Sequence, residues 1–420
     1  MRFSTALRQP IRRQIERLGD VDIVIGIPCY NNDETITHVI QAVEQGMTMY
    51  FPDKKCVTFV ADGGSVDDTR EVSRELQDSP WVERIISIYR GLPGKGSAVR
   101  AIFEGASMLE AKACCLFDSD LRSISPDWIK CVVEPIINDG YDFIAPYYTR
   151  YKYDGTITNN IVYNLTRALY GYRVRQPIGG DFAFSLPLIK KYISQDVWEG
   201  NIARFGIDIW LTTTAMIHKV KIAQANLGVK IHDVKDPAEA LGPMFRQVVS
   251  TLLDLMEDND KVWKKVKGSE AVPIVGPPLK IEPQPFNINV TKLVNDFKIG
   301  YQNWKEIWQK IVAPENWKLI EELYKRDEKD FLIVQESWAK ILYDLAGAYH
   351  HWKGNRELLV SLMTPLYFAR VASFVNKTID MTNEEAEEVV EAQAKVFEDN
   401  KDYLIKRWDD EVNFYESIKG

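Results

Sequence analysis

The stretch that decides the fold is CCLFDSDL, residues 114–121. An apolar run, which predicts a strand over residues 113–117, leads directly into Asp118 and Asp120. Alternation along an extended chain aims both carboxylates the same way. Neighbouring carboxylates repel each other, and a divalent cation relieves that repulsion. Oxygen ligands suit Mg²⁺ or Mn²⁺, which also binds a diphosphate, so the stretch predicts a metal site at the end of a strand.

Outward from this stretch, apolar strand-like runs alternate with amphipathic helical runs. Strands are expected at 21–27, 55–61 and 85–89, and helices at 34–46, 67–77 and 96–109. Weaker patterns predict strands at 143–146, 182–185 and 219–226, and a helix at 158–170. The alternation predicts an α/β fold, Rossmann-like, with a mostly parallel sheet flanked by helices. Ligands of such sheets bind beyond the carboxyl ends of the strands.

Polar loops follow the first three predicted strands. In PCYNNDETI (28–36), the segment 31–34 either contacts a nucleobase or caps the next helix. In ADGGSVDDT (61–69), Asp62 is placed to hydrogen-bond a base, although neighbouring residues are also good helix caps. In GLPGKGS (91–97), Lys95 stands between two glycines at a helix start, which suits a nucleotide contact despite incomplete phosphate-loop spacing.

Three later motifs add candidate groups. QPIGGD (176–181) is a turn that lets the backbone approach a substrate closely. Asp208 is a carboxylate in the first turn of a predicted helix, where it either serves the site or caps the helix. His232, in VKIHD (229–233), either completes the ligand set of Asp120 or is a structural histidine.

Composition restricts the class of protein. The 420 residues carry a net charge of −8 with a pI near 5.4, which argues against nonspecific nucleic-acid binding. None of the five cysteines forms a CxxC pair, so buried, reduced thiols are expected rather than structural zinc. No signal peptide and no apolar run of about 18 residues were found, which predicts a cytoplasmic protein without a membrane span.

The predicted organisation has four parts. An N-terminal basic helix occupies 1–20, and the α/β domain follows at 21–272. A Pro-rich linker covers 273–289, and residues 290–420 show helical periodicity throughout. The many aromatic residues of this helical end favour a homodimer.

Taken together, these motifs resemble the nucleotide-diphospho-sugar transferases of the GT-A fold. Within that group the chain is similar to mannosylglycerate synthases, glucosyl-3-phosphoglycerate synthases and glucosylglycerate synthases. The similarity is carried by LPGKGSA, FDSDLRSISPDWI, YYTRYKYDGTIT, QPIGGDFAF, FGIDIWLTT and KIHD. It covers about residues 21–236 and, more weakly, 358–375.

The resemblance implies a retaining, metal-dependent enzyme. Asp120 and His232 match the ligands of Mg²⁺ or Mn²⁺, and Asp118 matches a carboxylate near the ribose. Arg150 and Thr158 match positions that hold glycerate. The other matched positions are Pro28, Tyr30, Asp62 and Lys95 for the nucleotide, and Gly179, Gly180, Asp181 and Asp208 for the donor sugar and acceptor, with Asp208, Arg150 and Gly180 expected at the reaction centre.

The expected reaction moves a hexose, glucose first, from a GDP-, UDP- or ADP-linked glucose or mannose to the 2-hydroxyl of D-glycerate or to 3-phosphoglycerate, for compatible-solute synthesis. Where the phosphoglycerate enzymes carry an arginine this chain has Gly180, and Asp233-Val234 replaces their Arg-Asn. With these replacements, fewer positively charged side chains can bind a phosphate on the acceptor, which favours free D-glycerate. Asn32 stands where the nucleotide loop of this family commonly has an acidic residue, so the base of the donor nucleotide is not determined. The rivals are an inverting GT-A enzyme, a nucleotidyltransferase and a nonenzymatic sugar-nucleotide binder.

Overall fold

The computed structural model describes residues 4–77, 79–231, 237–278 and 282–410, without the side chains of 237–241. The chain folds into two compact units. The α/β unit comprises 1–149, 174–234 and 271–283, and the helical unit comprises 150–173, 235–270 and 284–420. The predicted domains were continuous stretches, whereas the helical unit also takes in two segments, 150–173 and 235–270, from within the predicted α/β range.

The α/β unit is built on an eight-stranded sheet with the order β10-β8-β5-β7-β4-β1-β2-β3. All neighbours pair in parallel except β7, which runs antiparallel to both β4 and β5. The strands are β1 (Ile23–Cys29), β2 (Cys56–Asp62), β3 (Val82–Ile88), β4 (Ala113–Leu116), β5 (Phe143–Thr149), β7 (Ala183–Ser185), β8 (Ile222–Val229) and β10 (Ile274–Val275). This mostly parallel sheet flanked by helices is the expected α/β, GT-A fold.

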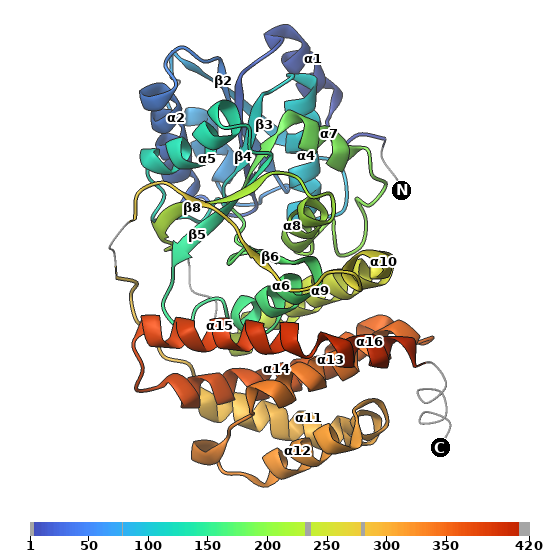
Figure 1. Ribbon diagram of the computed structural model, residues 1–420. Helices are drawn as coiled ribbons and strands as arrows, with labels where there is room; N and C mark the ends of the chain where they lie inside the picture. The colour runs from blue at the N-terminus through green and yellow to red at the C-terminus, as the bar shows by residue number, and fades with distance from the viewer. Residues whose placement is uncertain (1–3, 78, 232–236, 279–281, 411–420) are drawn as a thin grey trace. The chain divides into compact units, whose positions relative to one another are not determined.

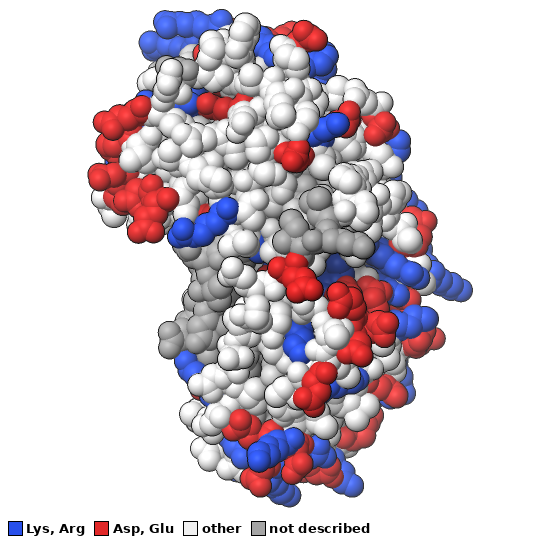
Figure 2. All heavy atoms as spheres, turned by 90° about the vertical axis from the view of Figure 1, so that its left-hand side faces the viewer, with Lys and Arg blue, Asp and Glu red and all other residues white. Residues whose placement is uncertain are grey.

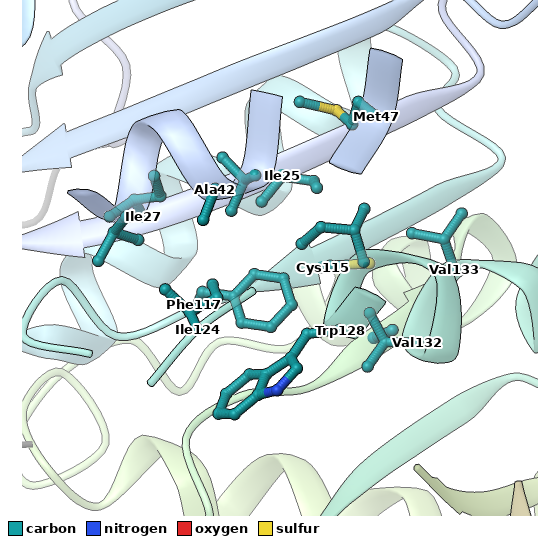
Figure 3. Packing of buried hydrophobic residues seen from close by; sticks show 14 of the residues in the cluster. Ile25, Ile27, Ala42, Met47, Cys115, Phe117, Ile124, Trp128, Val132 and Val133 are labelled. Carbon is teal, nitrogen blue, oxygen red and sulfur yellow. The ribbon is translucent and has the colours of Figure 1, made fainter. Parts of the chain in front are cut away.

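Helices cover both faces of this sheet, with α2 and α5 on one face and α4, α7 and α8 on the other (Figure 1). The helices are α1 (Gln9–Leu18), α2 (Ile36–Tyr50), α3 (Thr69–Glu75), α4 (Lys95–Met108), α5 (Pro126–Asn138), α7 (Leu186–Ile193) and α8 (Ile207–Ile217). Figure 3 shows the core under α2 and α5, where Ile25 and Ile27 of β1 pack with Phe117 and Trp128. Because both faces are covered, the central strands β1 and β4 are apolar along their whole length, whereas the edge strand β3 carries the exposed Glu83.

Two details of the sheet differ from the sequence pattern. The Pro-rich segment 273–289 was predicted to be an irregular linker, yet it contributes β10, which pairs with β8 at one edge of the sheet. The strand predicted at 182–185 forms as β7 but inserts antiparallel between β4 and β5. Neither pairing is visible in local periodicity, because both depend on strands distant in the sequence.

The helical unit begins with a π-helix, η1 (Thr158–Val162), that continues into α6 (Tyr163–Tyr170), where the sequence predicted one helix. Short strands β6 (Tyr172–Arg173) and β9 (Glu270–Ala271) pair with each other. The remaining elements are α9 (Pro237–Asp258), α10 (Asp260–Trp263), α11 (Val290–Ile311), α12 (Pro314–Lys325), the 3₁₀ turn η2 (Glu328–Asp330), α13 (Gln335–His351), α14 (Arg356–Thr378), α15 (Asn383–Asp399) and α16 (Lys401–Asp409).

Among the described helices, α14 alone is long and apolar enough to cross a membrane by length and composition, which the sequence analysis did not anticipate. Of its most apolar window, 72% is buried inside the structure, and the core helix of a soluble protein passes the same test. On the face that Figure 2 draws, acidic and basic side chains are mixed in places, and a wide area carries mostly uncharged side chains.

Candidate active site

A cluster of three carboxylates and two lysines lies at the carboxyl edge of the parallel strands. Asp118 follows β4, Lys230 is the first residue after β8, and Lys95 opens α4 after β3. Asp181 precedes β7, whose antiparallel course brings its start to the same edge, and Asp208 lies in the first turn of α8. The sheet topology therefore gathers residues from five separate segments, as expected for a doubly covered parallel sheet.

Each lysine bridges two carboxylates. Lys95 Nζ lies 2.7 Å from Asp118 Oδ1 and 3.0 Å from Asp208 Oδ2. Lys230 Nζ lies 2.9 Å from both Asp118 Oδ2 and Asp181 Oδ2. Two lysine ammonium groups thus neutralise Asp118. The sequence pattern had predicted that a divalent metal ion would relieve the repulsion between the two aspartates.

Further hydrogen bonds hold Asp181 and Lys230 in place. Lys230 also donates to the carbonyl of Gly179 at 2.9 Å. The buried Asp181 accepts from the backbone N–H of Asp118 at 2.9 Å and from the hydroxyl of Tyr148. Asp181 therefore connects the QPIGGD turn to the Asp-x-Asp loop, and its carboxylate accepts several of the hydrogen bonds of the cluster.

Burial and charge act in opposite directions on these groups. Burial alone would raise the pKa of Asp118, but the adjacent charges of Lys230 and Lys95 lower it well below its ordinary value. Burial raises the pKa of Asp181 and of Asp208, and the negative charge of Asp118 adds to the rise, which the neighbouring lysines oppose only in part. The pKa of Lys95 is raised, since the two carboxylates outweigh its burial. Asp118 is thus the fixed anion of the cluster.

One oxygen of this buried cluster has no partner. Asp208 Oδ2 binds Lys95, while Asp208 Oδ1 is buried without a hydrogen bond among the described residues. Asp208 is an acidic residue in the first turn of α8, where its charge suits the helix N-terminus, but its carboxylate makes no capping hydrogen bond among the described residues. Buried polar oxygens are normally paired, so Oδ1 is suited to accept a hydrogen bond from a ligand hydroxyl.

Position 180 requires glycine, because the backbone there lies close to the cluster. Its φ is +89°, and a Cβ there would stand 2.5 Å from Asp118 Oδ2 and 3.0 Å from Lys95 Nζ. Any side chain would therefore have to displace the ion pair. This is the position at which the phosphoglycerate enzymes were expected to carry arginine.

The GKG motif is shaped by protein packing. A Cβ on Gly96 would lie 1.8 Å from the carbonyl oxygen of Ile202, because the loop before α8 crosses the start of α4 at contact distance. Two backbone bonds hold this crossing, from Gly96 N to Arg204 O at 3.2 Å and from Ser97 N to Ala203 O at 3.0 Å. The crossing brings Lys95 on α4 to Asp208 on α8. Gly96 permits this crossing and thereby the ion pair between Lys95 and Asp208.

The loops after β1, β2 and β4 are hydrogen-bonded to one another. Asn31 N donates to Ser65 Oγ at 2.9 Å, and Asn31 Oδ1 accepts from Val66 N at 3.0 Å. Asn32 N donates to Thr69 Oγ1 at 2.7 Å, and Asn32 Oδ1 accepts from Ser119 Oγ at 2.7 Å. The segment 31–34 was expected to contact a base or to cap α2. Its two asparagines join the loops and α2 has no side-chain cap, while a contact with a base stays a prediction.

The predicted nucleotide-contacting residues occupy this rim of loops. Pro28 lies within β1 and is buried, whereas Tyr30 beyond it is 58% exposed. Asp62 is fully buried, and its carboxylate accepts from Gly64 N at 3.0 Å and Ser65 N at 3.1 Å. Asp62 thus organises its own loop, and a direct contact with a base stays a prediction.

The expected metal ligands are only partly described. The carboxylate of Asp120 makes no hydrogen bond or ion pair with any described residue. His232 lies outside the described residues, and its approach to Asp120 stays a prediction. Within the described ranges, no group of three or more His, Cys, Asp or Glu is arranged to hold a metal ion. Asp120 therefore fits a metal by its chemistry, with the remaining ligands not placed.

Arg150 and Thr158 belong to the helical unit, where the structure brings them to one turn. A Cβ at Gly155 would stand 3.3 Å from Arg150 Nη1 and 3.8 Å from Thr158 Oγ1, so the two side chains flank this glycine. Arg150 Nη1 also pairs with Asp154 Oδ2 at 3.3 Å. A guanidinium and a hydroxyl at one turn match the needs of a small hydroxy-acid ligand.

Lys230 is the site residue that sequence reasoning missed. It was part of the KIHD motif, but only the histidine of that motif received a role. A lysine directly after a buried strand, at the ligand-binding edge of the sheet, was the available signal. Its partners are 49 to 112 residues away in the sequence, and only the strand order brings them together.

Residues 24–198 match the family described as Glycosyl transferase family 2. None of the curated proteins matches the chain. Solved structures of glucosyl-3-phosphoglycerate synthase from Mycobacterium tuberculosis are similar to it. The complex with phosphoglyceric acid is 26% identical over 57% of this chain and 83% of that one, with a TM-score of 0.44. The complex with Mg²⁺ and uridine-diphosphate is 25% identical with the same coverage and TM-score.

The mostly parallel sheet flanked by helices has the GT-A fold, and the family match supports a glycosyltransferase. The similarity to glycosyltransferase family 2 extends over residues 24–198, less than half of the chain.

Proposed function

We propose that the chain is a retaining hexosyltransferase that moves glucose from a nucleoside-diphosphate sugar to the 2-hydroxyl of D-glycerate. The observation that carries the proposal is the partly buried cluster of Lys95, Lys230, Asp118, Asp181 and Asp208 at the carboxyl edge of the sheet, in a chain whose residues 24–198 match family 2. Such a cluster offers both cations for a diphosphate and a carboxylate oxygen for a sugar hydroxyl.

In the proposed step, the acceptor oxygen forms a bond to C1 of the donor sugar while the bond from C1 to the diphosphate oxygen breaks. The acceptor proton passes to the leaving phosphate oxygen, so no strong side-chain base is needed. Lys95 and Lys230 lie where they can stabilise the charge that develops on the diphosphate. Asp208 Oδ1, buried and without a described partner, accepts from a donor-sugar hydroxyl and orients the ring.

A divalent cation, Mg²⁺ or Mn²⁺, belongs to this proposal as a resident cofactor. Asp120 and His232 would hold it, and when bound it would neutralise the diphosphate as a Lewis acid. The support is the carboxylate of Asp120, two residues after Asp118, which has no partner among the described residues and offers the oxygen donors that suit a hard cation.

Arg150 and Thr158 are proposed to bind the acceptor, with the guanidinium on the carboxylate of glycerate. The preference for D-glycerate over 3-phosphoglycerate gains support at Gly180. A side chain there would collide with Asp118, so no cation for an acceptor phosphate fits at that position in this conformation. The alternatives are 3-phosphoglycerate as acceptor and mannose as the transferred sugar.

The testing experiment is a panel of GDP-, UDP- and ADP-linked glucose and mannose against D-glycerate and 3-phosphoglycerate, with Mg²⁺ or Mn²⁺, analysed by product mass. A glycosylglycerate product from D-glycerate supports the proposal, and transfer to 3-phosphoglycerate alone overturns the acceptor. NMR of the product anomer separates retention from the rival inverting reaction. Release of pyrophosphate from a sugar phosphate and a nucleoside triphosphate would instead identify a nucleotidyltransferase, and no turnover at all would leave a sugar-nucleotide binder.

The cellular setting is also a proposal. Donor and acceptor are both water-soluble, so we propose that the enzyme acts in the cytoplasm without a membrane anchor, and as a homodimer through its helical end. Sedimentation of the purified protein with and without membranes tests the first statement. Light scattering tests the second.

A further inference from the structure

The π-helix η1 is held in place by a buried arginine, and this has a consequence for acceptor binding. The five residues of η1, Thr158–Val162, are all buried, and the first of them is the proposed acceptor residue. A π-helical turn contains one residue more than an α-helical turn, is rare, and occurs frequently at functional sites. Such a turn persists only where its surroundings stabilise it.

Asn160, in the middle of η1, takes part in three hydrogen bonds that involve side chains, accepting two and donating one. Its carbonyl accepts from Trp338 Nε1 at 2.7 Å, and its Oδ1 accepts from Arg370 Nε at 3.1 Å. Its own Nδ2 donates to the carbonyl of Thr156 at 3.0 Å. Thr156 in turn shares a hydrogen bond of 2.6 Å with the hydroxyl of Tyr367. The residues on both sides of Thr158 are therefore fixed to α13 and α14.

Arg370 is an unusual residue for this task. It is 1% exposed, and its other contacts are with neutral acceptors, Nη1 with Ile333 O at 3.3 Å and Nη2 with Gln393 Oε1 at 2.9 Å. No carboxylate among the described residues pairs with it. Burial lowers the pKa of Arg370 to about 10, which still leaves the guanidinium charged at neutral pH. A buried charge without a counter-ion is costly, so its presence calls for an explanation beyond stability.

We infer that Arg370 is a positioning residue for the acceptor, acting through Asn160 to hold the η1 turn and thereby Thr158 in the geometry that binds glycerate. The inference rests on the proposed function. Thr158 is two residues from Asn160 and faces the same Gly155 turn as Arg150, so a shift of η1 changes the distance between the two acceptor groups. The donor-binding groups named above belong to other segments of the chain.

The test compares kinetic constants of the full chain and its variants for donor and acceptor separately. Arg370→Met keeps most of the side-chain volume but removes every hydrogen bond of Arg370. Trp338→Phe removes part of the indole ring and with it one hydrogen bond, to the Asn160 carbonyl. We expect the acceptor KM to rise about 10- to 100-fold in Arg370→Met, and less in Trp338→Phe, because misplacement by about 1 Å has effects of this size. The donor KM should stay within about twofold.

A matched control is available in the same unit. Trp308 is equally buried, and its indole N–H donates to the carbonyl of Leu362 at 3.1 Å, away from η1. Trp308→Phe should lower the melting temperature about as much as Trp338→Phe does while leaving the acceptor KM unchanged. If Arg370→Met does not fold, Trp338→Phe against Trp308→Phe decides the question.

Equal changes in donor and acceptor KM, or equal acceptor effects in the two tryptophan variants, would overturn the positioning role while leaving the proposed function intact. A wild-type chain without transfer to D-glycerate or 3-phosphoglycerate would overturn the proposed function, and with it this inference.

Discussion

Replacing Lys230 by methionine should destabilise the α/β unit strongly and in a pH-dependent way. Lys230 Nζ, on a side chain that is 5% exposed, lies 2.9 Å from Asp118 Oδ2, Asp181 Oδ2 and the carbonyl of Gly179. Methionine retains the volume but leaves the fully buried carboxylate of Asp181 without its cation. Removing one partner of a buried ion pair costs about 3–5 kcal/mol, and we expect Lys230→Met to fall in this range at neutral pH.

The pH dependence follows from the carboxyls that Lys230 faces. Burial raises the pKa of Asp181, and Lys230 opposes that rise, so its loss raises the pKa further. A carboxyl whose folded-state pKa exceeds its unfolded-state pKa retains its proton longer in the folded protein, so stability increases as pH falls through that window and is lost as pH rises. Asp118 adds to the effect, because its lowered pKa depends on Lys230 and stabilises the fold only above its unfolded-state pKa. The destabilisation should therefore be larger at about pH 8 than at about pH 5.

Urea denaturation of wild type and variant at the two pH values measures this difference. The control is Lys190→Met, which removes an exposed pair with Glu110, 2.8 Å apart, in the same unit. Exposed pairs contribute about 0–1 kcal/mol, so this variant should be nearly neutral at both pH values. A Lys230→Met protein as stable as Lys190→Met at neutral pH would refute the account of the cluster.

Three further substitutions test the site. Asp120→Ala should abolish metal-dependent transfer and change stability by less than about 0.5 kcal/mol, because its carboxylate has no described partner; wild-type-like turnover would remove the metal from Asp120. Arg150→Ala should raise the acceptor KM far more than the donor KM, and equal effects in steady-state kinetics would exclude it from acceptor binding. Gly180→Ala, with a Cβ 2.5 Å from Asp118 Oδ2, should lose more stability than Gly140→Ala, which has a φ of +65° and nothing within 4 Å. Both pay the strain of positive φ, about 1 kcal/mol, so equal melting temperatures would show that the contact is unimportant.

Much of the fold was predictable because its signals are local. The strand-helix alternation from β1 to β4, the α/β class and the helical end all follow from periodicity within short windows. Asp118 and Asp120 after a buried strand, together with the polar loops after the first three strands, located the ligand edge. The antiparallel β7 and the edge strand β10 were not predictable in their pairing, because β-pairing is decided by distant partners and not by local pattern.

The residues of the candidate site also divide into those with a local sequence signal and those whose role depends on distant partners. Lys95, Asp118 and Asp208 were recognised by type and position, and the structure brings all three together. Lys230 was missed, and so was the joining role of Asn31, because a polar side chain in a loop has the same local pattern whether it meets a ligand or another loop. Only the strand order, which places these loops at one edge, distinguishes the two roles.

The hydrogen bonds that join the loops after β1, β2 and β4 bear on how tightly a donor can bind. A loop that must become ordered when its ligand arrives loses conformational entropy at that moment, at a cost of about 0.5–1.5 kcal/mol for each immobilised side chain. Here Asn31 and Asn32 already tether three loops before any ligand is present, through Ser65, Thr69 and Ser119. A nucleotide entering this rim meets a surface whose ordering cost was met during folding, so more of its contact energy remains as affinity.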